Sequence, residues 1–182
     1  MRNKDNAFTL WITGLPASGK TTLANSIKEV LVKNGIITIV LDGDYMRKTV
    51  NKDLAFHLND REENNRRVAE IARMMNNEGI NVICSLITPT NKIRKKVGKI
   101  IGKENFVIIY LNTPINICES RDKKQLYQKA RQGKVSDFTG ISSIFEEPKS
   151  PDITLNGENS LTENSKQIIT FLSCNYHLRI NN

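Results

Sequence analysis

The chain has 182 residues, 38% of them hydrophobic, which is enough to bury one core but short for two. We therefore expect a single domain over residues 1–182. The formal net charge of +8 at pH 7 fits a protein that binds polyanions, but no aromatic stacking platform or nucleic-acid fold signature accompanies the basic residues. Composition thus predicts a small-molecule partner and no nucleic acid.

The apolar stretches are much shorter than the ~20 residues of a membrane span, and the charged start does not resemble a signal peptide. The three cysteines are odd in number and far apart, which argues against a disulfide framework. We expect a cytoplasmic protein with no membrane partner.

The first predicted strand, residues 8–13, runs directly into Gly-Leu-Pro-Ala-Ser-Gly-Lys-Thr at residues 14–21. This string matches G-x-x-x-x-G-K-[ST], a loop whose backbone N–H groups point at phosphate oxygens. The Lys20 ammonium reaches the β- and γ-phosphates, and the Thr21 hydroxyl binds Mg²⁺. The predicted nucleotide contacts are Gly14, Ala17, Ser18, Gly19, Lys20, Thr21 and Thr22. The loop predicts a protein that binds a nucleoside triphosphate with Mg²⁺.

Along the rest of the chain, apolar runs alternate with helical patterns. Nearly continuous apolar runs predict strands that are covered on both faces, at residues 8–13, 36–41, 82–85 and 106–111. Helical spacing predicts helices from Leu23 to a stop at Gly35, from a D-x-x-E capping box at Asp60 to Gly79, after Thr113-Pro114, and from Ser160 to Leu172. Residues 132–159 show no clear period. The alternation predicts a three-layer α/β/α fold of the P-loop NTPase type, with a central, mostly parallel sheet.

In such a sheet the ligand crevice lies beyond the carboxyl ends of the strands, so residues that follow each strand are candidate site residues. Asp42, Asp44 and Arg47 follow the second strand. Beside a triphosphate, these carboxylates would serve as Mg²⁺ ligands or as a base toward a hydroxyl nucleophile, with an ordinary polar turn as the alternative. Thr88 follows the third strand, and we expect its hydroxyl at the mouth of the crevice.

The helix from Asp60 and a basic segment complete the predicted crevice. Arg61 and Asn64 share a helix face with apolar residues, so we expect them to point inward and to clamp an anion. Lys and Arg crowd residues 121–134. We interpret this stretch as part of a lid, over about residues 120–145, that excludes water from the phosphates. A solvated helix face is the alternative.

Together these segments resemble the adenylylsulfate (APS) kinase family from about Phe8 to Leu172. The strings that carry the resemblance are GLPASGKTT, DGDYMR, DREENNRRVAEIA, SLITP, RDKKQLYQKARQGKVSDFTGI and FEEP followed by PDITL. The resemblance implies transfer of the γ-phosphoryl group of MgATP to the ribose 3′-hydroxyl of adenosine 5′-phosphosulfate (APS), giving 3′-phosphoadenylylsulfate and ADP. It also implies a homodimer.

The resemblance assigns roles to side chains by position. It implies that Lys20 and Asp44 are catalytic, with Lys20 on the triphosphate and Asp44 on the 3′-hydroxyl, and that Thr21 and Asp42 form the metal environment. It implies that the rings of Phe56 and Phe138 sandwich the acceptor base. The acceptor contacts that it implies are Asp44, Arg47, Phe56, Arg61, Asn64, Ile87, Thr88, Lys124 and Phe138.

The departures from the family pattern cluster around the acceptor. Tyr45 stands where Asn is usual, and His57 where Ser is common. Thr88 replaces a serine that is often marked as a phosphorylated intermediate, although direct in-line transfer needs none. An alternative acceptor of similar shape is cytidine 5′-diphosphoramidate, in a capsule phosphoramidate pathway. More distant alternatives are a nucleotide switch or ATPase and a nucleic-acid-binding protein.

Overall fold

The structure is a computed structural model that describes residues 7–176, 178 and 180. Over this part of the chain, five strands form one sheet in the order β2-β3-β1-β4-β5, and every neighbouring pair is parallel. The strands are β1 (Thr9–Thr13), β2 (Thr38–Asp42), β3 (Asn81–Ser85), β4 (Phe106–Asn112) and β5 (Ile153–Asn156). The predicted parallel sheet is confirmed.

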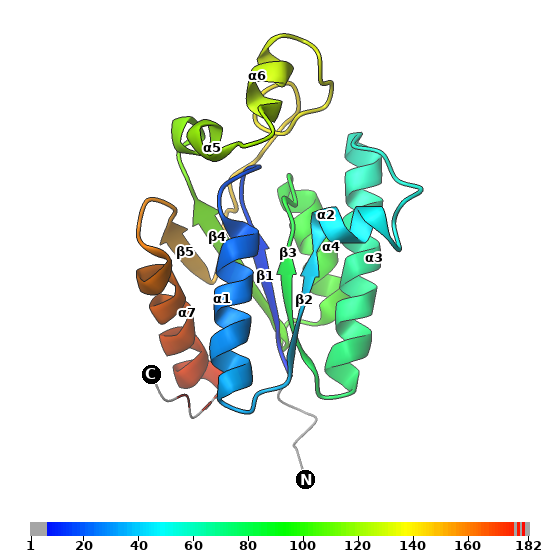
Figure 1. Cartoon of the computed structure of the whole chain (residues 1–182). Coiled ribbons are helices and arrows are strands. Elements are labelled where there is room, and N and C mark those ends of the chain that lie inside the picture. The colour runs from blue at the N-terminus through cyan, green and yellow to red at the C-terminus, as the bar shows by residue number, and fades with distance from the viewer. Residues whose placement is uncertain (1–6, 177, 179, 181–182) are drawn as a thin grey trace.

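Helices cover both faces of this sheet, which confirms the three-layer α/β/α arrangement (Figure 1). They are α1 (Lys20–Lys33), α2 (Gly43–Lys48), α3 (Leu58–Asn77), α4 (Asn91–Ile101), α5 (Ile115–Arg121), α6 (Leu126–Arg131) and α7 (Leu161–Tyr176). The pair α1 and α7 packs on one face, and the pair α3 and α4 packs on the other. None of the described helices is long and apolar enough to cross a membrane.

The central strand β1 is apolar between its terminal threonines because both of its faces are covered. Leu10 and Ile12 pack into the core beneath α1 and α7, whereas Trp11 packs on the opposite face against α3 and α4. All three side chains are fully buried. A strand covered on both faces has no solvent side, so it shows no polar alternation. Its carboxyl end delivers the glycine-rich loop to the edge of the sheet.

The segment predicted as a lid, about residues 120–145, rises beyond the carboxyl ends of the strands; it contains α6, and α5 leads into it (Figure 1). It has a small core of its own, in which Cys118, Tyr127, Ala130 and Phe138 are buried and Leu15 of the glycine-rich loop packs against them. This separate cluster lets the lid keep its shape while it rests on the phosphate-binding loop.

Three features of the fold differ from the sequence expectations. The unpatterned residues 132–159 contain the edge strand β5, and the residues after β2 form the short helix α2. The capping box at Asp60 is wrong, because α3 begins at Leu58 and the Glu63 carboxylate instead accepts hydrogen bonds from Arg66 and Arg67. By contrast, Ser160 and Glu163 do form a reciprocal cap at the start of α7.

Candidate active site

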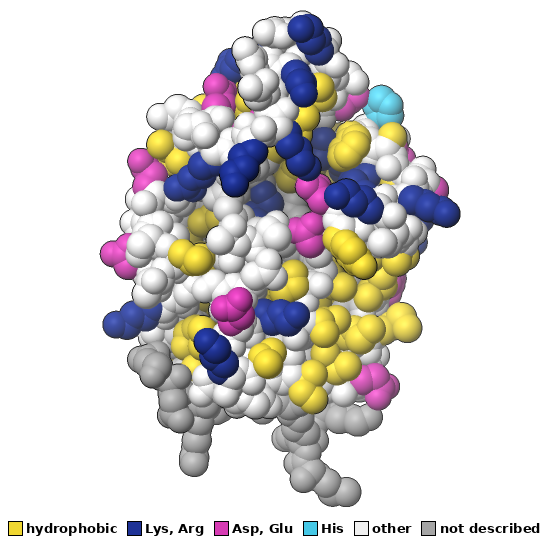
Figure 2. All heavy atoms as spheres, in the orientation of Figure 1, with side chains coloured by type: hydrophobic (Ala, Val, Ile, Leu, Met, Phe, Trp, Pro, Cys, Tyr) yellow, Lys and Arg dark blue, Asp and Glu magenta, His cyan; other side chains and the backbone are white. Residues whose placement is uncertain are grey.

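A cavity of about 770 Å³ lies where β1, β2 and β3 end and the lid begins. Its volume is within the range of small-molecule sites. Figure 2 shows Lys and Arg side chains gathered over the lid and around α2, with acidic side chains between them. The predicted site residues that line the cavity are Ala17, Gly19, Lys20, Thr21, Thr22, Asp42, Asp44, Arg47, Phe56, Arg61, Asn64, Ile87, Thr88, Lys124 and Phe138.

Two predicted nucleotide contacts, Gly14 and Ser18, do not line this cavity and instead shape the loop. A Cβ atom on Gly14 would lie 2.7 Å from the Leu111 carbonyl oxygen, so only glycine lets the loop approach β4 this closely. Ser18 is fully buried. Gly19 caps α1 with a left-handed backbone, φ 100°, which turns the chain into the helix. The start of α1 therefore faces the cavity, as an anion site requires.

The Lys20 side chain lies against the glycine-rich loop. Its Nζ donates hydrogen bonds to the Leu15 carbonyl at 2.6 Å and to the Ser18 hydroxyl at 3.2 Å. Burial lowers the pKa of Lys20 to about 8, while the acidic groups of Cys118, Asp44 and Asp42 oppose the shift. A desolvated ammonium that holds only neutral oxygens is well prepared to exchange them for phosphate.

Thr21 and Asp42 meet at the first turn of α1. The Thr21 hydroxyl donates to Asp42 Oδ2 at 2.7 Å and lies 3.3 Å from the Ser85 hydroxyl. The other Asp42 oxygen, Oδ1, caps α2 by accepting from the backbone N–H groups of Asp44 and Tyr45. Among the described residues no cluster of three or more His, Cys, Asp or Glu forms a metal cage. Hydroxyl and carboxylate oxygens still fit Mg²⁺, which usually keeps waters and phosphates as its remaining ligands.

Asp44 lines the cavity one helical turn from Arg47, with its side chain exposed. Its carboxylate accepts no hydrogen bond from any residue that the structure describes. Its negative charge partly opposes the lowering of the pKa of Lys20 and of Arg61 by burial, so it lies near both cations. A carboxylate without an internal partner, between two cations, is available to a hydroxyl group of a bound ligand.

Arg47 and Arg61 both lie over the ring of Phe56, with guanidinium carbons 4.8 Å and 5.5 Å from its centroid. Phe56 itself is exposed, whereas only 6% of Arg61 is accessible. Burial and the neighbouring Arg47 lower the pKa of Arg61 to about 10, so it stays charged at neutral pH. Two guanidinium groups close together form a binding site for a multivalent anion.

Two asparagines in the N-terminal half of α3 line the cavity and make buried hydrogen bonds. Asn64 points inward as predicted, and its Oδ1 accepts a hydrogen bond of 2.9 Å from the buried Asn51. The amide of Asn65 donates to the Arg61 carbonyl at 2.7 Å and thereby braces the first turn of the helix. The side chains of this turn are therefore fixed by buried polar contacts.

The expected placement of the Thr88 hydroxyl at the mouth of the cavity is wrong. Thr88 is fully buried, with a left-handed backbone at φ 47°. Its hydroxyl accepts from Trp11 Nε1 at 2.7 Å and donates to Asn65 Oδ1 at 2.7 Å. Thr88 contributes to the lining of the cavity, but the donor and acceptor functions of its hydroxyl are both used inside the protein.

Both basic and acidic residues of the lid line the cavity. Lys124 is exposed at the rim, and Phe138 is mostly buried in edge-on contact with Tyr127, with ring centroids 4.8 Å apart. The Tyr127 hydroxyl donates to the Pro16 carbonyl at 2.9 Å, which ties the lid to the phosphate-binding loop. Arg121 donates to the Gly157 carbonyl at 3.0 Å, which ties the lid to the end of β5.

Sequence reasoning missed several residues of the site. Asn65 lines the cavity because α3 turns a wider face inward than the predicted stripe. Ser85 also lines it, and its position as the last residue of β3 was a usable signal. The bond between Tyr127 and Pro16 joins residues 111 positions apart, so no local pattern reveals it.

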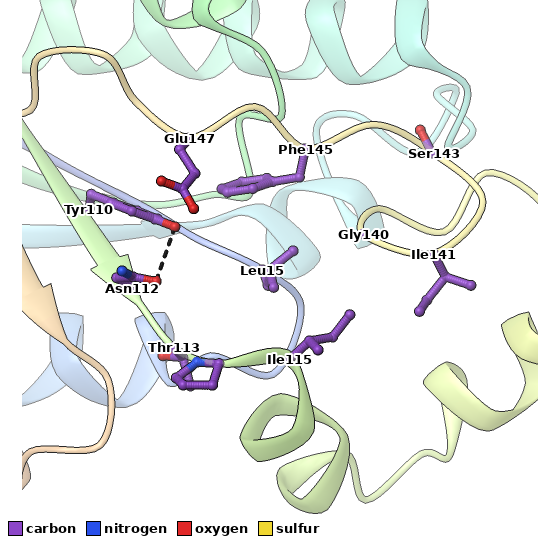
Figure 3. A pocket seen from close by; sticks show the side chains of 11 residues that line it. Leu15, Tyr110, Asn112, Thr113, Ile115, Gly140, Ile141, Ser143, Phe145 and Glu147 are labelled. Atoms are coloured by element: carbon purple, nitrogen blue, oxygen red, sulfur yellow. Dashed lines mark hydrogen bonds between the residues drawn. The ribbon is translucent and has the colours of Figure 1, made fainter.

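A second cavity, of about 410 Å³, lies beside β4 and shares no lining residue with the first. Figure 3 shows Tyr110, Phe145 and Glu147 on one side of it and the aliphatic side chains of Leu15 and Ile115 on the other. The Tyr110 hydroxyl donates to Asn112 Oδ1 at 3.2 Å. None of the predicted site residues lines this second cavity, whereas all of them except Gly14 and Ser18 line the larger one.

Comparisons with known proteins show which family this chain is similar to. The family model described as adenylylsulphate kinase matches residues 6–156. The adenylyl-sulfate kinase of Buchnera aphidicola subsp. Acyrthosiphon pisum is 47% identical over 171 residues, which is 94% of this chain and 83% of that protein.

Solved structures share the fold. The APS kinase of Mycobacterium tuberculosis in complex with AMPPNP and APS superposes with a TM-score of 0.89 at 37% identity, over 92% of this chain and 98% of that chain. A hexameric APS kinase from Thiobacillus denitrificans has a TM-score of 0.72 at 23% identity, over 98% of this chain and 31% of that one. The glycine-rich loop, the arginine pair and these relatives lead to one conclusion: the chain belongs to the adenylylsulphate kinase family of ATP-dependent kinases.

Proposed function

We propose that this protein transfers the γ-phosphoryl group of ATP to the ribose 3′-hydroxyl of adenosine 5′-phosphosulfate. The observation that carries the proposal is a single cavity lined both by the phosphate-binding loop and by the Arg47, Arg61 and Phe56 cluster. A nucleotide acceptor with a multivalent anion at its 5′ end matches that cluster, and the relatives are named for the same reaction.

In the proposed reaction the 3′-oxygen attacks the γ-phosphorus as the bond to the β–γ bridging oxygen breaks, and ADP leaves. Asp44 accepts the proton of the 3′-hydroxyl, for which its unpartnered carboxylate is suited. The Lys20 ammonium stabilises the negative charge that develops on the phosphoryl oxygens during transfer. Lys124 and the rest of the lid exclude water, so that the acceptor rather than water is phosphorylated.

Mg²⁺ is proposed as the metal of the donor site, where Thr21 and Asp42 would hold it. When bound, it supplies positive charge that neutralises the phosphate oxygens. The rest of the donor site belongs to this chain: the α1 N-terminus and Lys20 bind the phosphates, and Asp42 keeps α2 and Asp44 in place through its cap.

Steady-state assays test the acceptor directly. The purified protein is given ATP and Mg²⁺ with APS, with cytidine 5′-diphosphoramidate, or with no acceptor, and products are separated by anion-exchange chromatography. We expect a 3′-phosphorylated product with APS and slow release of phosphate without an acceptor. A product from the cytidine compound alone, or acceptor-independent hydrolysis at the full rate, contradicts the proposal.

Arg61→Ala separates the two halves of the cavity. Loss of a charged hydrogen-bond donor should raise the KM for APS by about 10-fold to 100-fold. The dissociation constant for AMPPNP in the absence of acceptor should not change. Arg73→Ala is the matched control, because Arg73 lies on the same helix but is exposed and pairs with Glu70. An equal loss of AMPPNP affinity in Arg61→Ala is inconsistent with an acceptor role.

We further propose that the protein works as a homodimer, the assembly that the sequence resemblance implies. Figure 2 shows hydrophobic side chains gathered over β2 and α3. Among the exposed apolar side chains, Ile37 is 56% accessible and Met74 is 62% accessible. Exposed apolar faces of this kind often bind partners. Light scattering should give twice the chain mass, and a monomer mass at micromolar concentration argues against the dimer.

A further inference from the structure

Two segments that each carry an aromatic residue of the main cavity meet at one ion pair. His57 directly follows Phe56 at the start of α3, and Asp137 directly precedes Phe138 in the lid. His57 Nδ1 lies 2.9 Å from Asp137 Oδ2. Because each partner is the chain neighbour of an aromatic residue, the pair joins the backbone positions from which the two rings project.

A second tie runs parallel to the first. Arg61 Nε donates to the Phe56 carbonyl at 2.8 Å, and its Nη2 donates to the Asp137 carbonyl at 2.8 Å. The same two segments are therefore joined once by a buried guanidinium and once by a pair nearer the surface. Since Arg61 also faces the cavity, a bound anion competes for its donors. His57 does not line the cavity, so its contact is available whether or not the anion is bound.

The backbone conformation of the lid at Asp137 and Phe138 is fixed by contacts within the lid. Asp137 has a left-handed conformation, φ 55°, which Asp tolerates better than most residues with a side chain. On the next residue, the Phe138 N–H donates to the Ser142 hydroxyl at 3.0 Å. The segment is thus fixed from within the lid on one side and by α3 on the other.

We propose that His57 and Asp137 are positioning residues that hold the lid against α3 and set the spacing between Phe56 and Phe138. Neither residue touches the reacting atoms. The proposal rests on the proposed function in one respect, namely that the acceptor base occupies the space between these rings.

The contact between His57 and Asp137 is a charge contact, in which a protonated imidazole attracts the carboxylate. His57 is 71% accessible and Asp137 is 34% accessible, so solvent screens the pair. The expected effect of breaking it is therefore modest, about twofold to fivefold in acceptor affinity.

Hydrogen exchange in the free protein tests the tie itself. His57→Ala and Asp137→Asn are compared with wild type by mass spectrometry of peptides that cover residues 133–143. We choose asparagine because it also tolerates positive φ. Both variants should exchange faster in this segment alone. Unchanged exchange overturns the proposal, and this readout stands even where wild type fails to phosphorylate APS, which would defeat only the proposed function.

Kinetics test the positioning role. Each single variant should raise the KM for APS by about twofold to fivefold, with kcat and the KM for ATP unchanged. The double variant should be no worse than either single variant, because both remove the same contact. Glu119→Gln is the matched control, since it removes an exposed ion pair with Arg131 inside the lid. Additive effects, an equal change in the KM for ATP, or an unchanged KM for APS overturns the role.

Discussion

At the scale of single residues, Thr88 shows how backbone conformation decides what a side chain does. A hydroxyl that follows a strand at the crevice is a natural candidate to face substrate. The hydroxyl of Thr88, a residue with a left-handed backbone, instead lies between the indole of Trp11 and the amide of Asn65. A hydroxyl with both its donor and its acceptor function engaged, and no access to solvent, is not placed to receive a phosphoryl group.

Thr88→Val should therefore act on stability. The substitution leaves the Trp11 N–H and the Asn65 oxygen buried without partners, which should cost about 2–4 kcal/mol of unfolding free energy. Thr88→Ser keeps the hydroxyl and should cost less than about 1 kcal/mol. Urea denaturation of both variants measures the difference. Equal stability of Thr88→Val and wild type would show that the two hydrogen bonds contribute nothing.

The lowered pKa of Lys20 predicts that ATP binding and turnover depend on pH. The buried ammonium has a pKa of about 8, below its ordinary value, so the free enzyme is charged below pH 8 and loses that charge as the pH rises. Phosphate binding favours the charged form. We expect kcat/KM for ATP to fall as pH increases through about 8, because this parameter reports groups of the free enzyme.

Lys20→Arg is the control for that profile. Arginine keeps its charge over the whole accessible range, so this variant should be slower but should show no inflection near pH 8. The measurement is initial rate at low ATP between pH 6.5 and about 9.5, with acceptor saturating. An inflection of the same size in Lys20→Arg assigns the pH dependence to another group.

At the scale of elements, the sequence predicts those helices and strands that are long enough to show a clear hydrophobic period. The strands β1, β3 and β4 and the helices α1, α3 and α7 appear where apolar runs and helical spacing place them, because each buries a continuous face. Strand β2 also forms, but it lies at the edge of the sheet and is only partly buried after Thr38, so it is not covered on both faces as predicted. The edge strand β5 was missed because its four residues alternate between exposed and buried and follow Pro151 and Asp152. Six-residue α2 is too short for a helical period to be visible.

Part of the candidate site is likewise predictable from the sequence, and part is not. Residues that directly follow strands, such as Asp42 and Asp44, are predictable because the fold brings all carboxyl ends to one edge. The contacts of Asp137 with His57 and Arg61 are not predictable, because they join segments about 80 positions apart through an irregular lid. Local sequence patterns therefore predict the phosphate-binding half of the cavity better than the half that depends on contacts between distant segments.

Asp42 links α2 to the donor site, and its two oxygens can be tested apart. Asp42→Asn keeps one oxygen to cap α2 but removes the carboxylate, so stability should fall by less than about 1 kcal/mol. The Mg²⁺ concentration for half-maximal activity should rise at least about 10-fold, because a neutral amide is a weaker ligand for a hard cation. Activity against Mg²⁺ concentration, with urea denaturation alongside, measures both effects.

Asp42→Ala completes the comparison. It also removes the cap that the Asp44 and Tyr45 N–H groups use, which should cost a further ~1 kcal/mol and loosen Asp44. The alanine variant should therefore lose more kcat than the asparagine variant at saturating Mg²⁺. An unchanged Mg²⁺ requirement in both variants removes Asp42 from the metal environment.

At the scale of the whole molecule, the lid and the three-layer body meet around the phosphate-binding loop. Tyr127 bonds to the loop, Arg121 to the end of β5, and Asp137 to the start of α3. A donor nucleotide bound at the loop would add a further connection between the lid and the body. Because a ligand that binds only the folded state stabilises it by mass action, nucleotide binding should appear as global stability.

We predict that AMPPNP with Mg²⁺ at about 100 times its dissociation constant stabilises the protein by about 2.7 kcal/mol. For a domain of this size that corresponds to a rise in melting temperature of roughly 5–10 °C. Lys20→Ala should lose most of this shift and about 100-fold or more in kcat, because the charge on the transferring phosphoryl group is no longer matched. Lys28→Ala, on the exposed face of the same helix, should behave as wild type. Differential scanning calorimetry with and without nucleotide makes the comparison, and a full shift in Lys20→Ala would place the triphosphate away from Lys20.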